Sequence, residues 1–147
     1  MAQSDFAALH TPGDPLILYN IWDAGSAQAV EKAGAKALAT GSASVAGAMG
    51  DDDGEGVPFE ALLTGVRQSA SVAKVPLSVD FETGFAPSLD GLAANARALI
   101  EAGAVGCNLE DRLLDGDELR PVSDQAQRVA VTAQAGLFVN ARTDTFL

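Results

Sequence analysis

The sequence predicts an α/β fold built on an all-parallel sheet. Short apolar runs of strand length alternate with helical segments, and the strand starts recur roughly every 20 to 40 residues. Charged residues follow the third, fourth and fifth of these runs. Crossovers between parallel strands are right-handed, so successive units add side by side, and ligands bind at the carboxyl ends of the strands. We therefore expect the functional residues at that edge.

The first elements are predicted from caps and apolar runs. Ser4 is positioned to cap a short helix that ends at residues 11–13, Thr-Pro-Gly. Residues 16–19, Leu-Ile-Leu-Tyr, predict the first strand. A helix over residues 27–33 is expected between the cap Ser26 and the stop Gly34, followed by a second strand over residues 35–40. Residues 41–44, Gly-Ser-Ala-Ser, are small, so their backbone amides can approach a ligand closely.

The remaining elements repeat the same order. Pro58 is placed near the start of a helix whose apolar stripe contains Leu62, Leu63, Val66 and Ala70. The third strand is the apolar run 75–79, ending at Asp80. Ser88 is expected to cap a helix closed by Gly103, before a fourth strand over residues 105–109. A last helix runs from Ser123 to Gly136, and residues 137–142 predict the fifth strand.

Composition limits the classes of function. The 147 residues suit one domain, 1–147, with a net charge of −11 and a sequence pI near 4.2. This charge argues against nucleic acid and anionic membranes as partners, but not against a small anionic substrate. No run is long enough to span a bilayer, and MAQSDFAALH is not a secretory signal. The single cysteine, Cys107, is expected to pack in the core, and we expect a cytoplasmic protein.

The length is short for a complete barrel. Eight strand–helix units need about 250 residues, and this chain reaches only the fifth expected strand. It is either the first five units of a (β/α)₈ TIM-type barrel or a smaller closed sheet. The first alternative is favoured, because a sheet ending there exposes an apolar edge.

Three carboxylates are the candidate metal ligands. Asp80 and Glu82, two residues apart, are expected to share one face of the strand, and Glu110 follows the next strand. Adjacent carboxylates repel one another unless a cation or a shared proton intervenes. A hard divalent ion, most simply Mg²⁺, would relieve that repulsion. The alternative for the motif that contains Asp80 and Glu82, taken alone, is a solvated acidic turn at the end of a strand.

Two further residues have a functional and a structural interpretation. Arg142, at the end of the fifth expected strand, can clamp a substrate carboxylate or pair with Asp144 or Glu110. Asp53, in a glycine-flanked acidic loop, can be a mobile acid, base or nucleophile, although the residues alone favour a solvated loop. His10 is the one histidine and precedes the first strand, so we expect a surface or capping role for it and no nucleophile–histidine pair.

Six motifs in order resemble the isocitrate lyase/phosphoenolpyruvate mutase superfamily. They are Asn-Ile-Trp-Asp-Ala-Gly-Ser-Ala at 20–27, Thr-Gly-Ser-Ala-Ser at 40–44, Met-Gly-Asp-Asp-Asp-Gly-Glu at 49–55, Asp-Phe-Glu-Thr-Gly-Phe at 80–85, Gly-Cys-Asn-Leu-Glu-Asp at 106–111 and Asn-Ala-Arg-Thr-Asp at 140–144. The resemblance implies a (β/α)₈ barrel of that type, with about its first five units present, and an oligomer when full length. It also implies a Mg²⁺-dependent enzyme acting on 2-oxo acids or related carboxylates.

The resemblance also implies roles for individual residues. Asp80 matches the direct metal ligand, and Glu82 and Glu110 match groups that hold the ion through water. Arg142 matches the arginine that grips the substrate carboxylate, Asp53 the mobile-loop aspartate, and Gly41, Ser42 and Ala43 the loop that binds substrate through its amides. Mg²⁺ would then polarise a 2-oxo acid and stabilise an enolate.

The segment after the fourth strand limits the reactions that can be expected. Residues 112–119 read Arg-Leu-Leu-Asp-Gly-Asp-Glu-Leu, without the cysteine and histidine of the lyase motif or the lysines of the mutase motif. Isocitrate-type cleavage and phosphonopyruvate mutation are therefore disfavoured. We expect a lyase-type cleavage of a C–C or C–P bond through an enolate. The alternatives are a phosphonopyruvate or oxaloacetate hydrolase, a decarboxylase, an inactive binding-only fragment and a half-barrel that oligomerises.

Overall fold

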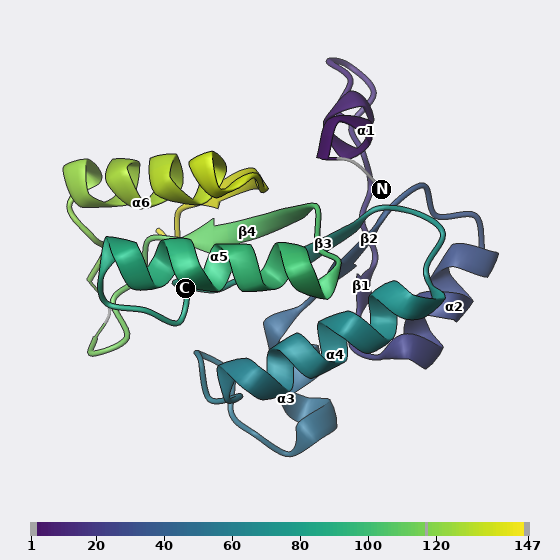
Figure 1. Cartoon of the computed structure of the whole chain (residues 1–147), viewed down its shortest axis with the longest axis horizontal. Coiled ribbons are helices and arrows are strands. Elements are labelled where there is room, and N and C mark those ends of the chain that lie inside the picture. The colour runs from purple at the N-terminus through teal and green to yellow at the C-terminus, as the bar shows by residue number, and fades with distance from the viewer. Residues whose placement is uncertain (1–2, 117, 146–147) are drawn as a thin grey trace.

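The chain forms a parallel five-stranded sheet in the sequential order β1-β2-β3-β4-β5, flanked by helices (Figure 1). The structure is a computed structural model that describes residues 3–116 and 118–145. Its elements are α1 Gln3–Ala8, β1 Asn20–Ile21, α2 Ala24–Lys32, β2 Leu38–Thr40, α3 Ser42–Met49, α4 Phe59–Val72, β3 Leu77–Asp80, α5 Leu89–Ala102, β4 Gly106–Glu110, α6 Val122–Ala135 and β5 Phe138–Arg142.

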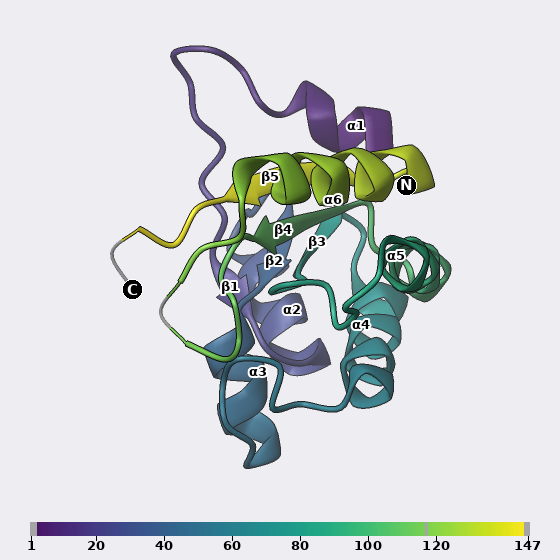
Figure 2. The same ribbon diagram turned by 90° about the vertical axis from the view of Figure 1, so that its left-hand side faces the viewer.

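Helices α2, α4, α5 and α6 follow one another along one side of the sheet (Figures 1 and 2), each packing against the next. Sequential strand order with helices on one side is the arrangement of consecutive units in a (β/α)₈ barrel wall. Within the described ranges, each helix is too short or too polar to cross a bilayer.

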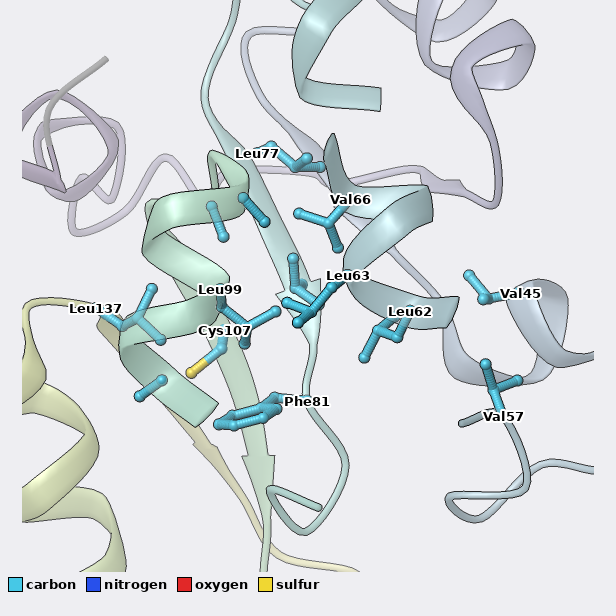
Figure 3. Close-up of a cluster of buried hydrophobic side chains, with 14 of the residues drawn as sticks. Val45, Val57, Leu62, Leu63, Val66, Leu77, Phe81, Leu99, Cys107 and Leu137 are labelled. Carbon is cyan, nitrogen blue, oxygen red and sulfur yellow. The ribbon is translucent and has the colours of Figure 1, made fainter. Parts of the chain in front are cut away.

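The apolar core lies between the sheet and helices α4 and α5 (Figure 3). Val79, Cys107 and Leu109 are fully buried on the sheet side of it. Because Cys107 is fully buried, the expectation of a core cysteine is confirmed. This burial raises the pKa of its thiol to about 12. Because side chains alternate along a strand, the even-numbered positions Asp80 and Glu110 lie on the opposite face.

Helix α1 covers the end of the sheet at which the strands begin. Phe6 packs against Ala37 and Val105, and its ring meets that of Phe138 edge-on at 5.3 Å. His10 stacks on Phe138 and its Nδ1 lies 3.0 Å from the carbonyl oxygen of Phe6. His10 is therefore a surface residue at the end of the sheet where the strands begin, away from their carboxyl ends.

The first strand was predicted at the wrong residues. Residues 16–19 lie outside any strand, and β1 comprises only Asn20 and Ile21, paired with Ala39 and Thr40 of β2. Ile17 and Tyr19 are 68% and 65% exposed, so their apolar character does not report burial in the sheet.

The segment after β2 was predicted as a loop but is the helix α3. Gly41 is its N-terminal cap, and Gly50, with φ of 82°, ends it in the left-handed conformation. Small residues such as those of Ser42–Met49 give little amphipathic signal, and the buried members of the helix are only Val45 and Ala46.

Helix starts were predicted with mixed success. Ser88 caps α5 by accepting a hydrogen bond from the Gly91 N–H at 3.1 Å, as expected. The cap of α2 is Asp23, and Ser26 is the reciprocal partner three residues later. Ser123 lies inside the first turn of α6, whose cap position is Pro121, and Ser4 lies inside α1.

Candidate active site

Three neighbouring strands end in charged residues at one edge of the sheet. Asp80 is the last residue of β3, Glu110 of β4 and Arg142 of β5. In the strand register Asp80 is opposite Asn108, and Glu110 is opposite Arg142. Because side chains alternate along a strand, Asp80, Glu110 and Arg142 all lie on the face of the sheet away from the helical core. Two carboxylates and one guanidinium group are thus found at the carboxyl ends of neighbouring strands.

Asp80 is buried and held by backbone and hydroxyl groups. Its Oδ2 accepts a hydrogen bond from the Ser42 N–H at 3.1 Å, at the start of α3. Its own N–H donates to the Thr40 hydroxyl at 2.8 Å. Oδ1 is buried and has no hydrogen-bond partner among the described residues. This oxygen therefore retains free lone pairs, which is unusual for a buried carboxylate.

Glu82 reaches the same edge by a turn, because β3 stops at Asp80. Its φ of 48° is left-handed, so the expected strand alternation does not extend to this residue. The Glu82 carbonyl oxygen accepts the Glu110 N–H at 2.7 Å, which keeps the two residues side by side. The Glu82 carboxylate accepts the Glu55 N–H at 2.5 Å.

The ionised forms of Glu82 and Glu110 are disfavoured in this arrangement. Burial raises the pKa of Glu82 to about 7, and the charges of Asp53, Glu55 and Asp80 act in the same direction, against the Glu55 hydrogen bond. Burial and the charge of Asp80 likewise raise the pKa of Glu110, although Arg142 opposes the shift. Such raised values identify a site where extra positive charge would be stabilising.

Arg142 makes both of the pairings considered from the sequence. Its Nη1 lies 2.7 Å from Glu110 Oε1, and its Nε donates to Asp144 Oδ1 at 2.7 Å. Its side chain is 36% exposed, so part of the guanidinium remains accessible. The clamp interpretation and the pairing interpretation are thus compatible in space.

A cavity of about 180 Å³ opens between these groups. Its lining residues are Ser42, Asp53, Gly54, Glu82, Thr83, Glu110, Arg112, Leu114 and Arg142. Five of the sequence-predicted site residues therefore share one cavity, and Asp80 adjoins it through Ser42. Arg112 adds a second cation that the sequence did not single out. The volume suits a small acid better than a large ligand.

Gly41 and Ala43 are the sequence neighbours of Ser42, and neither is among the residues that line the cavity. Gly41 is buried, and a Cβ there would lie 2.5 Å from Asn20 Nδ2, so glycine is needed for close packing. Ala43 is exposed in the first turn of α3. The Ser42 amide, expected to bind substrate, is engaged by Asp80.

The donor chemistry fits a hard divalent cation. Carboxylate oxygens are the preferred ligands of such ions, and Asp80 Oδ1 is a buried oxygen with free lone pairs. However, in residues 3–116 and 118–145 no three acidic, histidine or cysteine side chains lie close enough together to hold an ion directly. The metal assignment of Asp80, Glu82 and Glu110 thus remains a prediction.

Two supporting residues were missed in the sequence. Glu55 Oε1 accepts hydrogen bonds from the Thr83 N–H, the Thr83 hydroxyl and the Phe85 N–H. Arg128 of α6 is 1% exposed and donates to the carbonyl oxygens of Thr83 and Ala86. Arg128 lies four residues before the buried Thr132, so an arginine on the inward stripe of α6 was the available signal. Glu55 gave none beyond its place in the acidic loop.

Comparison with known protein families shows to which family this chain is related. A family model described as phosphoenolpyruvate phosphomutase matches residues 6–147. The chain belongs to this family. The superfamily expected from the six motifs is therefore confirmed, and the phosphoenolpyruvate mutase family adopts TIM-type barrels, as expected.

Individual proteins that are similar to this chain support the family assignment. The 2-methylisocitrate lyase of Escherichia coli K12 is 31% identical over 109 residues, which cover 74% of this chain and 37% of that protein. A presumed phosphonomutase from Burkholderia cenocepacia J2315 is 43% identical with a TM-score of 0.94, covering 98% of this chain and 61% of the other. Phosphonopyruvate hydrolase, solved with oxalate and Mg²⁺, has a TM-score of 0.89 at 20% identity, covering 98% and 53%.

This chain thus spans between 37% and 61% of the length of these three proteins. The five described strands are five units of the barrel type that the family shares.

Proposed function

We propose that this chain carries the metal- and carboxylate-binding part of a Mg²⁺-dependent enzyme that cleaves a C–C or C–P bond in a small 2-oxo acid or related carboxylate. The observation that supports it best is that Glu82, Glu110 and Arg142 line one small cavity, which Asp80 adjoins through its hydrogen bond from Ser42. Relatives named as lyases, mutases and a hydrolase of such acids agree with the reaction class.

The residues divide into two tasks in this proposal. Asp80, through its buried Oδ1 that lacks a hydrogen-bond partner among the described residues, would contact Mg²⁺ directly, and Glu82 and Glu110 would hold it through water. When bound, Mg²⁺ supplies positive charge that stabilises negative charge developing on a substrate oxygen.

The second task is to bind the substrate's carboxylate. Arg142 offers the exposed part of its guanidinium, and Arg112 lines the same cavity. An anion competing with Glu110 for Arg142 would free a carboxylate that the cation can use, so substrate and metal binding would support each other. Asp53, exposed at the cavity rim, is placed to exchange a proton with the reacting group.

Calorimetric titration with Mg²⁺, followed by oxalate as a mimic of a planar enolate, tests the proposal. We expect Mg²⁺ binding that strengthens oxalate binding, and we expect Asp80→Ala to abolish both. Asp90→Ala removes an exposed carboxylate from the first turn of α5 and serves as control. Equal Mg²⁺ affinity in wild type and Asp80→Ala would contradict the metal assignment, whereas binding without turnover of any 2-oxo acid would favour the binding-only alternative.

A further inference from the structure

Glu55 joins the acidic loop to the turn that follows β3 through hydrogen bonds in both directions. Its Oε1 accepts from the Thr83 N–H at 3.1 Å, the Thr83 hydroxyl at 2.6 Å and the Phe85 N–H at 2.9 Å. In return its own N–H donates to Glu82 Oε2 at 2.5 Å. The loop and the turn are about 28 residues apart in sequence, so this exchange fixes two separate segments against each other.

The backbone at this junction is held in an uncommon conformation. Glu55, Glu82 and Phe85 have φ values of 62°, 48° and 54°, and they are the non-glycine residues with positive φ among those described. Each takes part in the exchange of hydrogen bonds centred on Glu55. Non-glycine residues keep such values only where surrounding contacts enforce them, and these positions concentrate at functional sites.

Charge alone does not explain this arrangement. Glu55 is an acid placed beside other acids, and its charge adds to the repulsion felt by Glu82. A carboxylate is tolerated here because three donors converge on one of its oxygens. The contribution of Glu55 is therefore geometric, through its acceptor oxygen and its amide.

We propose that Glu55 is a positioning residue that locks the acidic loop 51–56 onto the β3–α5 turn and thereby sets the place of the Glu82 carboxylate and of Asp53 in the cavity. This inference rests on the proposed function for its consequence, metal binding. The lock itself is a property of the chain alone and is tested without metal.

Three variants separate position from charge. Glu55→Ala removes the acceptor, Glu55→Gln keeps an acceptor oxygen without the charge, and Asp51→Asn changes an exposed acid of the same loop. Amide hydrogen exchange of Thr83 and Phe85 in metal-free protein should rise about tenfold in Glu55→Ala, and stay within about threefold of wild type in Glu55→Gln and Asp51→Asn. The midpoint of global unfolding, followed in parallel, identifies any general loss of fold.

Mg²⁺ titration of the same variants reads out the consequence. We expect Glu55→Ala to weaken Mg²⁺ binding about tenfold, Glu55→Gln to restore most of it, and Asp51→Asn to change it little. Unchanged exchange at Thr83 and Phe85 in Glu55→Ala would overturn the lock, as would equal losses of Mg²⁺ affinity in the Ala and Gln variants. Absence of Mg²⁺ binding in wild type would instead reject the proposed function, and the exchange data would then decide the lock by themselves.

Discussion

Replacing the buried Arg128 by Met should destabilise the chain by about 2–3 kcal/mol. Arg128 donates to the carbonyl oxygens of Thr83 at 2.6 Å and of Ala86 at 2.9 Å. A buried acceptor left without a donor costs about 1–3 kcal/mol, and the hydrogen bond to Thr83 is buried whereas that to Ala86 is partly buried. Burial lowers the pKa of Arg128, so relief of that desolvation offsets part of the loss. Met preserves the packing of the side-chain stem.

Urea and thermal unfolding followed by circular dichroism measure this change. For a chain of this size the loss corresponds to a fall in Tm of roughly 5–10 °C. Arg97→Met, at an exposed position on α5, is the matched control and should stay within about 0.5 kcal/mol of wild type. Indistinguishable stabilities of the two variants would refute the role of Arg128 in supporting the turn that carries Glu82.

Three other perturbations test single features of the site and core. Burial raises the pKa of Glu82 from 4.5 to about 7 in the folded chain, so the stabilising contribution of its protonated form is complete below about pH 4.5 and is lost as the pH rises through about 7. The urea concentration at the midpoint of unfolding, measured without Mg²⁺, should therefore fall between these pH values. In Glu82→Gln this dependence of the midpoint on pH should be weaker. Gly41→Ala should cost about 1–3 kcal/mol through overlap with Asn20, whereas Gly47→Ala, with open space at its Cβ, should not destabilise the chain; equal chemical-denaturation midpoints would contradict this. Cys107 should react with a thiol reagent only at the rate of global unfolding, and fast labelling of the native chain would be inconsistent with its burial.

Regular elements were predictable where packing is periodic. The stripe of Leu62, Leu63 and Val66 places α4 correctly, and Ser88 and Gly103 mark the two ends of α5. These signals are local, because a helix on a sheet buries one face and needs a cap at each end. The sequential order of the strands follows from the same repeated unit.

Irregular parts of the site were not predictable in this way. Alternation along β3 ends at Asp80, and Glu82 reaches the cavity through a left-handed turn, where its carboxylate accepts a hydrogen bond from Glu55, a residue distant in sequence. The two hydrogen bonds from Arg128 likewise come from α6, some 42 to 45 residues away. Sequence patterns report interactions between residues that are close along the chain, whereas these contacts depend on the tertiary structure. Proximity of Asp80 and Glu110 was foreseeable, because the ends of parallel strands share one edge.

Titration with Mn²⁺, a paramagnetic substitute for Mg²⁺, tests the central claim most directly. Nuclear magnetic resonance of the labelled chain would report which amides broaden at low Mn²⁺. We predict selective broadening at Ser42, Asp80, Glu82 and Glu110, competed by Mg²⁺ and lost in Asp80→Ala. Broadening confined to the exposed acidic residues 51–53, or spread evenly over the surface of a chain with net charge −11, would contradict a cation site at the ends of β3 and β4.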